Sequence, residues 1–276
     1  MEVWLLIAAA TCVGLALARR WIAFNWRAIL FYIYTSFFSL LGIPYFLLRP
    51  CDSVNCTHWT QILRLCSYLV GIKWEVRGMK IMSQRRGCVV VANHQSSFDV
   101  LGMFWFWPWS YRIAAVAKKE IFYAWPFGLA AWLAGVVFID RINSERARGQ
   151  LAHAARLMAK DNVKLWLFPE GTRNKRRCLM PFKKGAFHVA IACQAPIMPV
   201  VYSPYYFINP HNKYHTGGKV VITVLPYIET KGLTLDDVED LMNRVKSEME
   251  KVYFKVAEEL KAELPPDHPG LVGFED

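Results

Sequence analysis

The stretch CVVVANHQSSFD, residues 88–99, joins a short β-branched run to a histidine and an aspartate. Residues 88–92 are typical of a buried strand, and Asn93-His94 interrupts that run. The apolar, tryptophan-containing segment that follows is typical of a helix, with Asp99 in its first turn. The carboxylate of Asp99 can then fold back and hydrogen-bond one imidazole nitrogen of His94.

Strand-like and helix-like segments alternate on both sides of this stretch, from about residue 53 onward. Such alternation predicts an α/β fold, with a central mixed sheet and flanking helices on both faces. Residues at the ends of parallel strands would gather along one edge of that sheet. The expected strands are 72–76, 88–92, 113–116, 136–139, 164–168, 197–202 and 220–225, and the expected helices are 54–70, 97–107, 118–132, 144–160, 183–194 and 234–263.

The composition favours a membrane and an anionic ligand. Apolar residues make up 54% of the 276 residues, and the 11 tryptophans are typical of a protein at a membrane–water interface. The net charge of +11 would suit nucleic acid, anionic lipid head groups or anionic small substrates, but no arginine-rich tract or nucleic-acid-binding signature accompanies it. The 7 cysteines form no C-x-x-C pair, which indicates reduced thiols rather than disulfides or a zinc site.

Two apolar runs near the N-terminus, residues 3–18 and 28–48, predict a hydrophobic helical membrane anchor made of two segments over residues 1–52. The α/β domain is expected over residues 53–263 and a C-terminal tail over residues 264–276.

Three arginines between these runs, Arg19, Arg20 and Arg27, indicate that the connection faces the cytosol. Two full spans would then place the α/β domain on the lumenal side. One span followed by a segment that dips in and returns, or two segments within one leaflet, would leave the domain in the cytosol. The sequence leaves these topologies open.

An imidazole paired with a carboxylate is prepared to act as a general base. The Asp99 carboxylate would fix the tautomer of His94 and stabilise the imidazolium that forms on proton uptake. The alternative is a turn histidine and a helix-capping aspartate without chemistry. There is no G-x-S-x-G turn, Ser96 and Ser97 lie where capping is the commoner role, and no cysteine has an evident base partner. The simplest reaction is direct transfer, in which His94 activates a substrate hydroxyl.

A second cluster of polar residues follows another expected strand, in LFPEGTRN, residues 167–174. Gly171 allows close approach of a ligand, and Thr172 and Arg173 can bind phosphate oxygens. Glu170 is placed to hold the neighbouring arginine. The alternative is an ordinary solvated turn.

Further cations are expected at the same edge of the sheet. Arg141 ends the run GVVFIDR, residues 135–141, and Lys183 and Lys184 precede a helix N-terminus, where anions are favoured. Each lysine alone is more often a solvated charge than a ligand. A His–Asp base, several cations and a membrane-seeking surface together predict proton abstraction beside an anionic lipid.

Four segments, in order, carry a resemblance to a known family. The chain resembles the glycerolipid acyltransferases with the N-H-x-x-x-x-D motif, and among them the 1-acylglycerol-3-phosphate (lysophosphatidic acid) acyltransferases of animals, over roughly residues 55–255. The segments are NHQSSFD at 93–99, GVVFIDR at 135–141, FPEGTR at 168–173 and APIMPVV at 195–201.

The resemblance implies a reaction and a set of roles. The acyl group would pass from acyl-CoA, a co-substrate and not a bound cofactor, to the sn-2 hydroxyl of lysophosphatidic acid, giving phosphatidic acid and CoA without a metal. His94 would be the base and Asp99 its orienting partner. The residues expected to hold the acceptor's phosphate are Arg141, Glu170, Gly171, Thr172 and Arg173, with Lys183 as a further substrate-binding candidate.

The resemblance also implies a place in the cell, the endoplasmic reticulum membrane, with the active site facing the cytosol. The expected partners are lysophosphatidic acid, acyl-CoA and membrane lipid, and not nucleic acid. Two alternatives stay open. One is a sibling acyltransferase for glycerol-3-phosphate or another lysophospholipid, and the other is a non-catalytic lipid-binding membrane protein.

A third apolar run, residues 121–139, is long enough for a spanning helix. Pro126 and Gly128 interrupt it, and the family's chemistry requires His94 and Arg173 in one site. We therefore expect this run not to cross the membrane and to lie partly in the interface. The tryptophans expected to anchor that surface, or else to belong to the core, are Trp105, Trp107, Trp109, Trp125 and Trp132.

Overall fold

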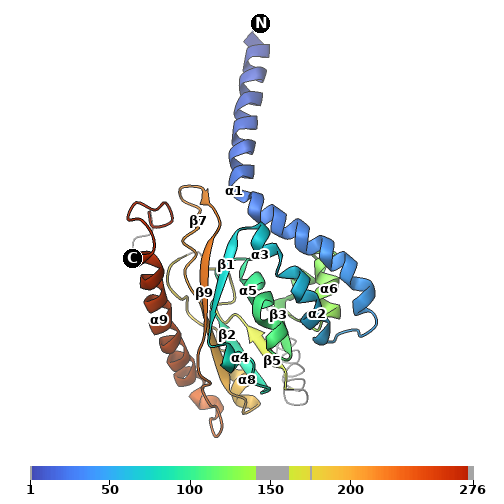
Figure 1. The fold of residues 1–276 in the computed structure, drawn as a ribbon, viewed down its shortest axis with the longest axis vertical. Coiled ribbons are helices and arrows are strands. Elements are labelled where there is room, and N and C mark those ends of the chain that lie inside the picture. Colours follow the sequence, from blue (N-terminus) through green and yellow to red (C-terminus); the bar gives the residue numbers. More distant parts are fainter. Residues whose placement is uncertain (1, 141–161, 175, 273–276) are drawn as a thin grey trace.

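A computed structural model describes residues 2–140, 162–174 and 176–272, with side-chain surroundings from Thr11 onward. Its seven-stranded sheet has the order β1-β9-β6-β2-β5-β3-β4. Helices cover both faces of the sheet. The C-terminal part of the long helix α1 lies against the domain, and its N-terminal part projects away from it (Figure 1). The predicted α/β fold with a mixed central sheet is confirmed.

The helices and strands have the following bounds. The α-helices are α1 (Glu2–Phe46), α2 (Val54–Leu63), α3 (Cys66–Leu69), α4 (Met79–Met82), α5 (Asp99–Phe106), α6 (Phe127–Leu133), α8 (Gly185–Ala192) and α9 (Val238–Ala262), and the 3-10 turns are η1 (Trp107–Trp109), η2 (Lys119–Tyr123) and η3 (Leu235–Asp237). The strands are β1 (Ile72–Arg77), β2 (Cys88–Ala92), β3 (Ile113–Lys118), β4 (Val137–Ile139), β5 (Lys164–Leu167), β6 (Ile197–Tyr202), β7 (Ile208–Asn209), β8 (Tyr214–His215) and β9 (Gly218–Val224).

The direction of the strands determines where polar residues gather. Strands β6, β2, β5, β3 and β4 run parallel to one another, while β9 is antiparallel to β6 and parallel to β1. The central strands β2, β5 and β6 are buried along their whole length, as their mainly apolar sequences require when helices cover both faces. The carboxyl ends of the five parallel strands therefore form one edge.

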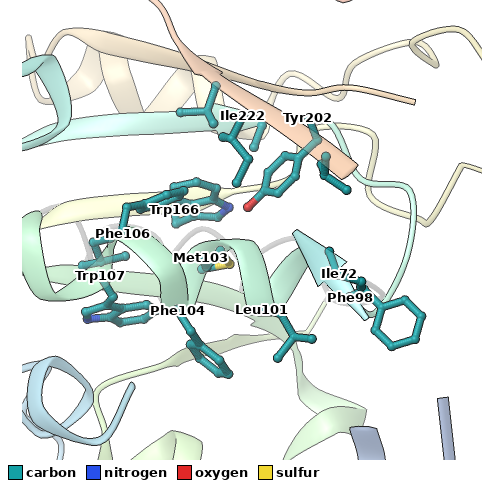
Figure 2. Close-up of a cluster of buried hydrophobic side chains, with 14 of the residues drawn as sticks. Ile72, Phe98, Leu101, Met103, Phe104, Phe106, Trp107, Trp166, Tyr202 and Ile222 are labelled. Atoms are coloured by element: carbon teal, nitrogen blue, oxygen red, sulfur yellow. The ribbon is translucent and has the colours of Figure 1, made fainter. Parts of the chain in front are cut away.

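Each face of the sheet has its own hydrophobic core. On one face α8 and α9 pack against the strands, with Phe187 and Met249 fully buried. On the other face α5 packs through an aromatic cluster that includes Trp166 and Tyr202 (Figure 2). Gly102 makes this close packing possible, because a Cβ at that position would lie 2.6 Å from Cε1 of Tyr202. The close approach fixes α5, and with it Asp99 in its first turn, against the sheet.

Several expected elements have different bounds in the structure. The helix expected over 54–70 is divided into α2 and α3. The helix expected over 118–132 is replaced by the end of β3, the η2 turn and the short α6, because Pro126 prevents one continuous helix there. The β7–β8 hairpin was not predicted. The helix expected over 144–160 lies outside the described residues.

The two N-terminal apolar runs form one continuous helix, α1, and this corrects the expected division into two segments with a connection between them. Arg19, Arg20 and Arg27 lie within α1, since the residues between the runs include no proline or glycine to end the helix. The Arg27 guanidinium donates a 2.7 Å hydrogen bond to the carbonyl oxygen of His215. The second apolar run is thereby fastened to the domain, while residues 11–23 are exposed.

Among the described residues, one helical stretch, Thr11–Phe46, is long and apolar enough to cross a membrane. The run 121–139 is not, because it is divided among η2, α6 and β4, and β4 pairs with β3 inside the sheet. The run therefore does not form the single spanning helix that its hydropathy alone would suggest, and its place at the membrane stays a prediction. The division of the chain at residues 52 and 263 stays a prediction.

The tryptophans expected at the interface fall into two groups. Trp107 is only 2% exposed, so of the two alternatives given for it the core is correct and the membrane anchor is not. Trp109, Trp125 and Trp132 are exposed. Trp105 is half-buried. The exposed tryptophans are available to a membrane surface, and their role as anchors stays a prediction.

Candidate active site

The site begins where β2 ends, at Asn93 and His94. Asn93 is buried, and its side-chain amide exchanges two hydrogen bonds with the backbone of Tyr202 at the end of β6, donating at 3.0 Å and accepting at 2.8 Å. This link joins the ends of two adjacent strands and fixes the backbone that carries His94.

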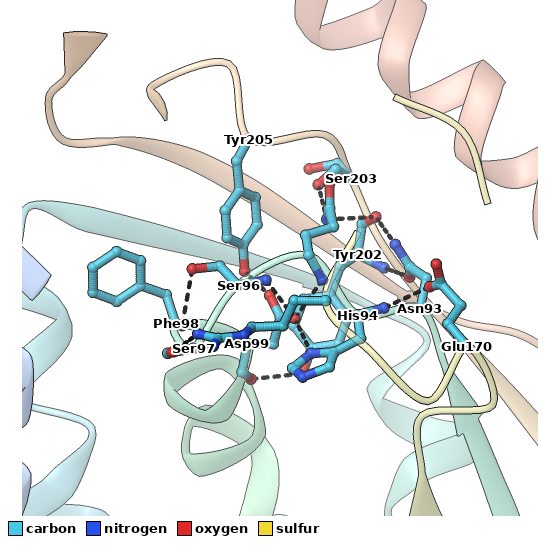
Figure 3. Close-up of polar contacts among 12 residues, drawn as sticks. Asn93, His94, Ser96, Ser97, Phe98, Asp99, Glu170, Tyr202, Ser203 and Tyr205 are labelled. Atoms are coloured by element: carbon cyan, nitrogen blue, oxygen red, sulfur yellow. Dashed lines mark hydrogen bonds and ion pairs between the residues drawn. The ribbon is translucent and has the colours of Figure 1, made fainter. Parts of the chain in front are cut away.

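The imidazole of His94 and the carboxylate of Asp99 are in direct contact. His94 Nδ1 and Asp99 Oδ2 are 2.6 Å apart, and Oδ2 also accepts hydrogen bonds from the backbone N–H groups of Gln95 at 2.7 Å and Ser96 at 3.0 Å (Figure 3). Asp99 is completely buried. A buried carboxylate surrounded by donors keeps the proton on Nδ1 and leaves the lone pair on Nε2. The predicted His–Asp contact is confirmed.

The other Asp99 oxygen has a partner that the sequence did not reveal. The Tyr205 hydroxyl donates a 2.6 Å hydrogen bond to Asp99 Oδ1. Burial and the negative charge of Asp99 raise the pKa of Tyr205 well above its usual value, so this hydroxyl stays protonated and remains a donor. Both oxygens of the carboxylate thus have hydrogen-bond partners, which holds Asp99 in one orientation.

The side chain of His94 is packed on one face of its ring and is partly exposed. Its ring stacks on Phe168, with centroids 4.1 Å apart, and its side chain is 20% exposed. Within the described residues Nε2 has no hydrogen-bond partner. The ring nitrogen that could accept a substrate proton is therefore available.

Glu170 has a different position from the one predicted for a phosphate ligand. It is 3% exposed, and its two oxygens accept hydrogen bonds from the backbone N–H groups of His94 at 2.8 Å and Met180 at 3.2 Å. Burial raises the pKa of the Glu170 carboxyl, although these N–H groups act in the opposite direction. Glu170 therefore supports the backbone of His94 instead of holding Arg173 or an anion.

A pocket of about 390 Å³ opens beside the base, and we call it the arginine pocket. Arg173 lies in its wall and donates a 2.5 Å hydrogen bond to the Ser97 hydroxyl, which also bonds the Tyr32 hydroxyl of α1 at 2.6 Å. Arg173 is in this way connected to α1. The lining residues are Gln95, Ser96, Thr172, Arg173, Asn174, Arg176, Arg177, Tyr205, Ile208 and Pro210.

The turn between β5 and the pocket depends on Gly171. Its φ of +71° is in the left-handed region, and a Cβ there would lie 2.8 Å from Cε of Lys183. The Lys183 side chain therefore crosses the turn, outside the residues that line the pocket. A substrate-binding role for Lys183 stays a prediction.

The structure brings together most of the predicted site. His94, Asp99, Glu170, Thr172 and Arg173 meet at the carboxyl ends of β2 and β5. Arg141 lies outside the described residues, and its role stays a prediction. Sequence reasoning missed Tyr205, Arg176 and Arg177; the two arginines stand in the basic run KRR, residues 175–177, directly after FPEGTRN, which was a usable signal.

We expect Tyr205→Phe to lower kcat about tenfold, because it removes one charge-assisted hydrogen bond from the carboxylate that orients the base. The KM for either substrate should change little. Steady-state kinetics with the purified protein checks this. Tyr214→Phe is a control, because that hydroxyl bonds His268 and Thr216 away from Asp99. A Tyr205→Phe protein with unchanged kcat would show that this bond does not position the base.

Comparisons with known proteins agree with this geometry. A model of the Acyltransferase family matches residues 73–203. The 1-acyl-sn-glycerol-3-phosphate acyltransferase alpha of Homo sapiens is 40% identical over 222 residues, covering 80% of this chain and 78% of that protein. The beta protein of Homo sapiens is 38% identical over 210 residues, covering 76% and 74%.

The fold also has a counterpart among solved structures. The crystal structure of the 1-acyl-sn-glycerophosphate (LPA) acyltransferase PlsC from Thermotoga maritima superposes with a TM-score of 0.65 at 24% identity, covering 89% of this chain and 99% of that one. This likeness shows a shared fold, and the similarity in sequence to the two human proteins, together with the family model, places the chain among the α/β acyltransferases. With 40% identity over 80% of its length, the chain belongs to the 1-acyl-sn-glycerol-3-phosphate acyltransferase family, as its motifs predicted.

Proposed function

We propose that this protein transfers an acyl group from acyl-CoA to the sn-2 hydroxyl of 1-acyl-sn-glycerol-3-phosphate, giving phosphatidic acid and free CoA. The observation that carries the proposal is the pairing of His94 and Asp99 at 2.6 Å, directly before Gln95 and Ser96 in the wall of the arginine pocket. This arrangement places a base, His94, close to a proposed phosphate-binding group, Arg173. It suits an acceptor whose hydroxyl lies close to its phosphate.

His94 has a role at each stage of the reaction. Its Nε2 takes the proton of the sn-2 hydroxyl as the oxygen attacks the thioester carbon. The carbon–sulfur bond then breaks, and the imidazolium returns the proton to the departing thiolate. The buried charge of Asp99 stabilises the imidazolium between these events.

Neither nearby serine is placed as a nucleophile. Ser96 Oγ accepts a 3.3 Å hydrogen bond from the backbone N–H of Phe98, as a helix-start residue does. Ser97 Oγ is engaged by Arg173 and Tyr32. Neither hydroxyl contacts His94, so direct transfer without an acyl-enzyme is the reaction that the geometry favours.

Arg173 is the proposed phosphate ligand, because it is exposed in the pocket wall next to the base. We expect Arg173→Lys to raise the KM for lysophosphatidic acid by about 10- to 100-fold, the equivalent of one lost hydrogen bond to a charged group. The KM for acyl-CoA should change little. An unchanged KM for lysophosphatidic acid would show that Arg173 does not bind the phosphate, and Arg141 and Lys183 would be the next candidates.

We further propose that α1 anchors the protein in the endoplasmic reticulum membrane with the site on the cytosolic side. Two observations support this: the exposed pair Arg19 and Arg20 follows the projecting apolar part of α1, and the positive-inside bias places such charges in the cytosol. A cytosolic site also has direct access to acyl-CoA.

The orientation is tested with single cysteines in a variant that lacks the seven native ones. Ser83→Cys and Lys231→Cys are at exposed positions, one before and one after residues 121–139 in the sequence. We expect both to react with an impermeant maleimide from the cytosolic side of sealed microsomes, because β4 pairs within the same sheet. Detergent-opened microsomes provide the control for total reactivity. Labelling from opposite sides, or from the lumen, would contradict this topology.

An acceptor panel tests the proposed function. Membranes containing the protein are given radiolabelled acyl-CoA with lysophosphatidic acid, glycerol-3-phosphate or lysophosphatidylcholine. We expect phosphatidic acid to be the main labelled product. Preference for another acceptor would indicate a sibling acyltransferase, and no transfer to any of them would indicate a non-catalytic lipid-binding protein.

A further inference from the structure

The arginine pocket holds more positive charge than the sequence motifs predict. Arg176 and Arg177 line it together with Arg173 and with Gln95, the residue that follows the base. The described residues that line it include three arginines and no aspartate or glutamate. A ligand group with more than one negative charge is therefore the best match for the pocket.

The length of each substrate indicates which phosphate enters this pocket. In lysophosphatidic acid only C2, C3 and one ester oxygen separate the sn-2 oxygen from phosphorus, so the phosphate must bind close to the base. In acyl-CoA the whole pantetheine arm separates the thioester from the phosphates. Because the pocket begins at Gln95 and Ser96, directly after His94, it suits the acceptor's phosphate.

The position of Arg177 is set by the C-terminal segment, residues 265–272. Its Nη2 donates a hydrogen bond to the Gly270 carbonyl, and its guanidinium carbon lies 4.6 Å from the centre of the Tyr206 ring. Gly270 leaves no room for a side chain, because a Cβ there would overlap the Tyr206 carbonyl. The segment therefore packs tightly against the backbone beside the pocket.

The C-terminal segment also holds the β7–β8 hairpin, residues 208–215, which lines the pocket through Pro210. The buried Asn209 amide donates hydrogen bonds to the carbonyl oxygens of Pro269 at 2.9 Å and Val272 at 2.7 Å. Two parts of the pocket wall thus depend on residues that follow the last helix.

We propose that Arg176 and Arg177, supported by the C-terminal segment, form a subsite that selects acceptors with a phosphomonoester over those with a phosphodiester. The inference rests on the proposed function and names its acceptor class. A monoester carries a charge of about −1.5 to −2 near pH 7 and offers three terminal oxygens. A phosphodiester has only two terminal oxygens and one negative charge, so it can form fewer charge-assisted hydrogen bonds to the three arginines.

The selectivity is measured as the ratio of kcat/KM for lysophosphatidic acid to kcat/KM for its methyl phosphodiester, at saturating acyl-CoA. Arg176→Ala and Arg177→Ala are each expected to lower this ratio about tenfold, the size of one lost hydrogen bond to a charged group. The KM for acyl-CoA should stay unchanged. Lys213→Ala is the control, because it removes an exposed cation of the hairpin that does not line the pocket.

Gly270→Ala tests the supporting role of the segment and should lower the same ratio, whereas Pro266→Ala, at an exposed position nearby, should not. If Gly270→Ala does not accumulate in membranes, Asn212→Ala is the alternative. It removes one exposed hydrogen bond to the Pro269 carbonyl oxygen without adding an atom, and it should shift the ratio in the same direction. An unchanged ratio in the two arginine variants, or a raised KM for acyl-CoA, overturns the proposal. A wild-type protein inactive with both substrates would instead refute the proposed function.

Discussion

Replacing His94 by alanine is expected to lower kcat by about 10²–10⁴-fold, the usual contribution of a general base. The protein should still reach the membrane in normal amounts, because the ring of His94 is partly exposed and its backbone contacts to Glu170 and Asn174 remain. The measurement is the steady-state rate of phosphatidic acid formation at saturating concentrations of both substrates.

His188→Ala is the matched control, since it removes an exposed imidazole on α8 and should leave kcat unchanged. If the His94→Ala protein kept most of the wild-type activity, His94 would not be the base. The His–Asp contact would then be a structural feature of the turn between β2 and α5.

Asp99→Asn is expected to lower kcat by up to about 10⁴-fold, the loss seen when the carboxylate of a serine-protease triad is changed to an amide. An amide oxygen can still meet Nδ1 of His94, but it carries no charge to stabilise the imidazolium. The KM values should change much less than kcat.

A double-mutant cycle makes this prediction specific. The Tyr205 hydroxyl reaches His94 through its hydrogen bond to Asp99, so the effect of Tyr205→Phe should shrink in the Asp99→Asn protein. Multiplicative losses in the double variant would contradict a shared network. A fall in membrane yield, and not in kcat, would assign Asp99 to folding.

The His–Asp pair could be predicted from the sequence because its two residues are close together along the chain. His94 and Asp99 are five positions apart, and one strand–turn–helix unit brings them together. Tyr205 is 106 positions from Asp99, and its contact depends on β6 lying next to β2 in the sheet. No spacing rule predicts such a neighbour, because strand order is decided by packing of the whole domain.

Two predictions made from charge and composition, the division of α1 and the placing of the tryptophans, differ from the structure for physical reasons. Arg19 and Arg20 interrupt the apolar pattern, but they are good helix formers and α1 continues through them. Tryptophan is equally suited to a core and to an interface, so composition did not separate the buried Trp107 from the exposed Trp125. In each case the tertiary surroundings decide the outcome.

Direct transfer by His94 is tested most directly by initial rates measured over a matrix of acyl-CoA and lysophosphatidic acid concentrations, with the acyl group radiolabelled. The account predicts double-reciprocal lines that intersect, and label in phosphatidic acid only when both substrates are present. Parallel lines, with label retained on the protein when acyl-CoA is supplied alone, would show an acyl-enzyme and contradict it.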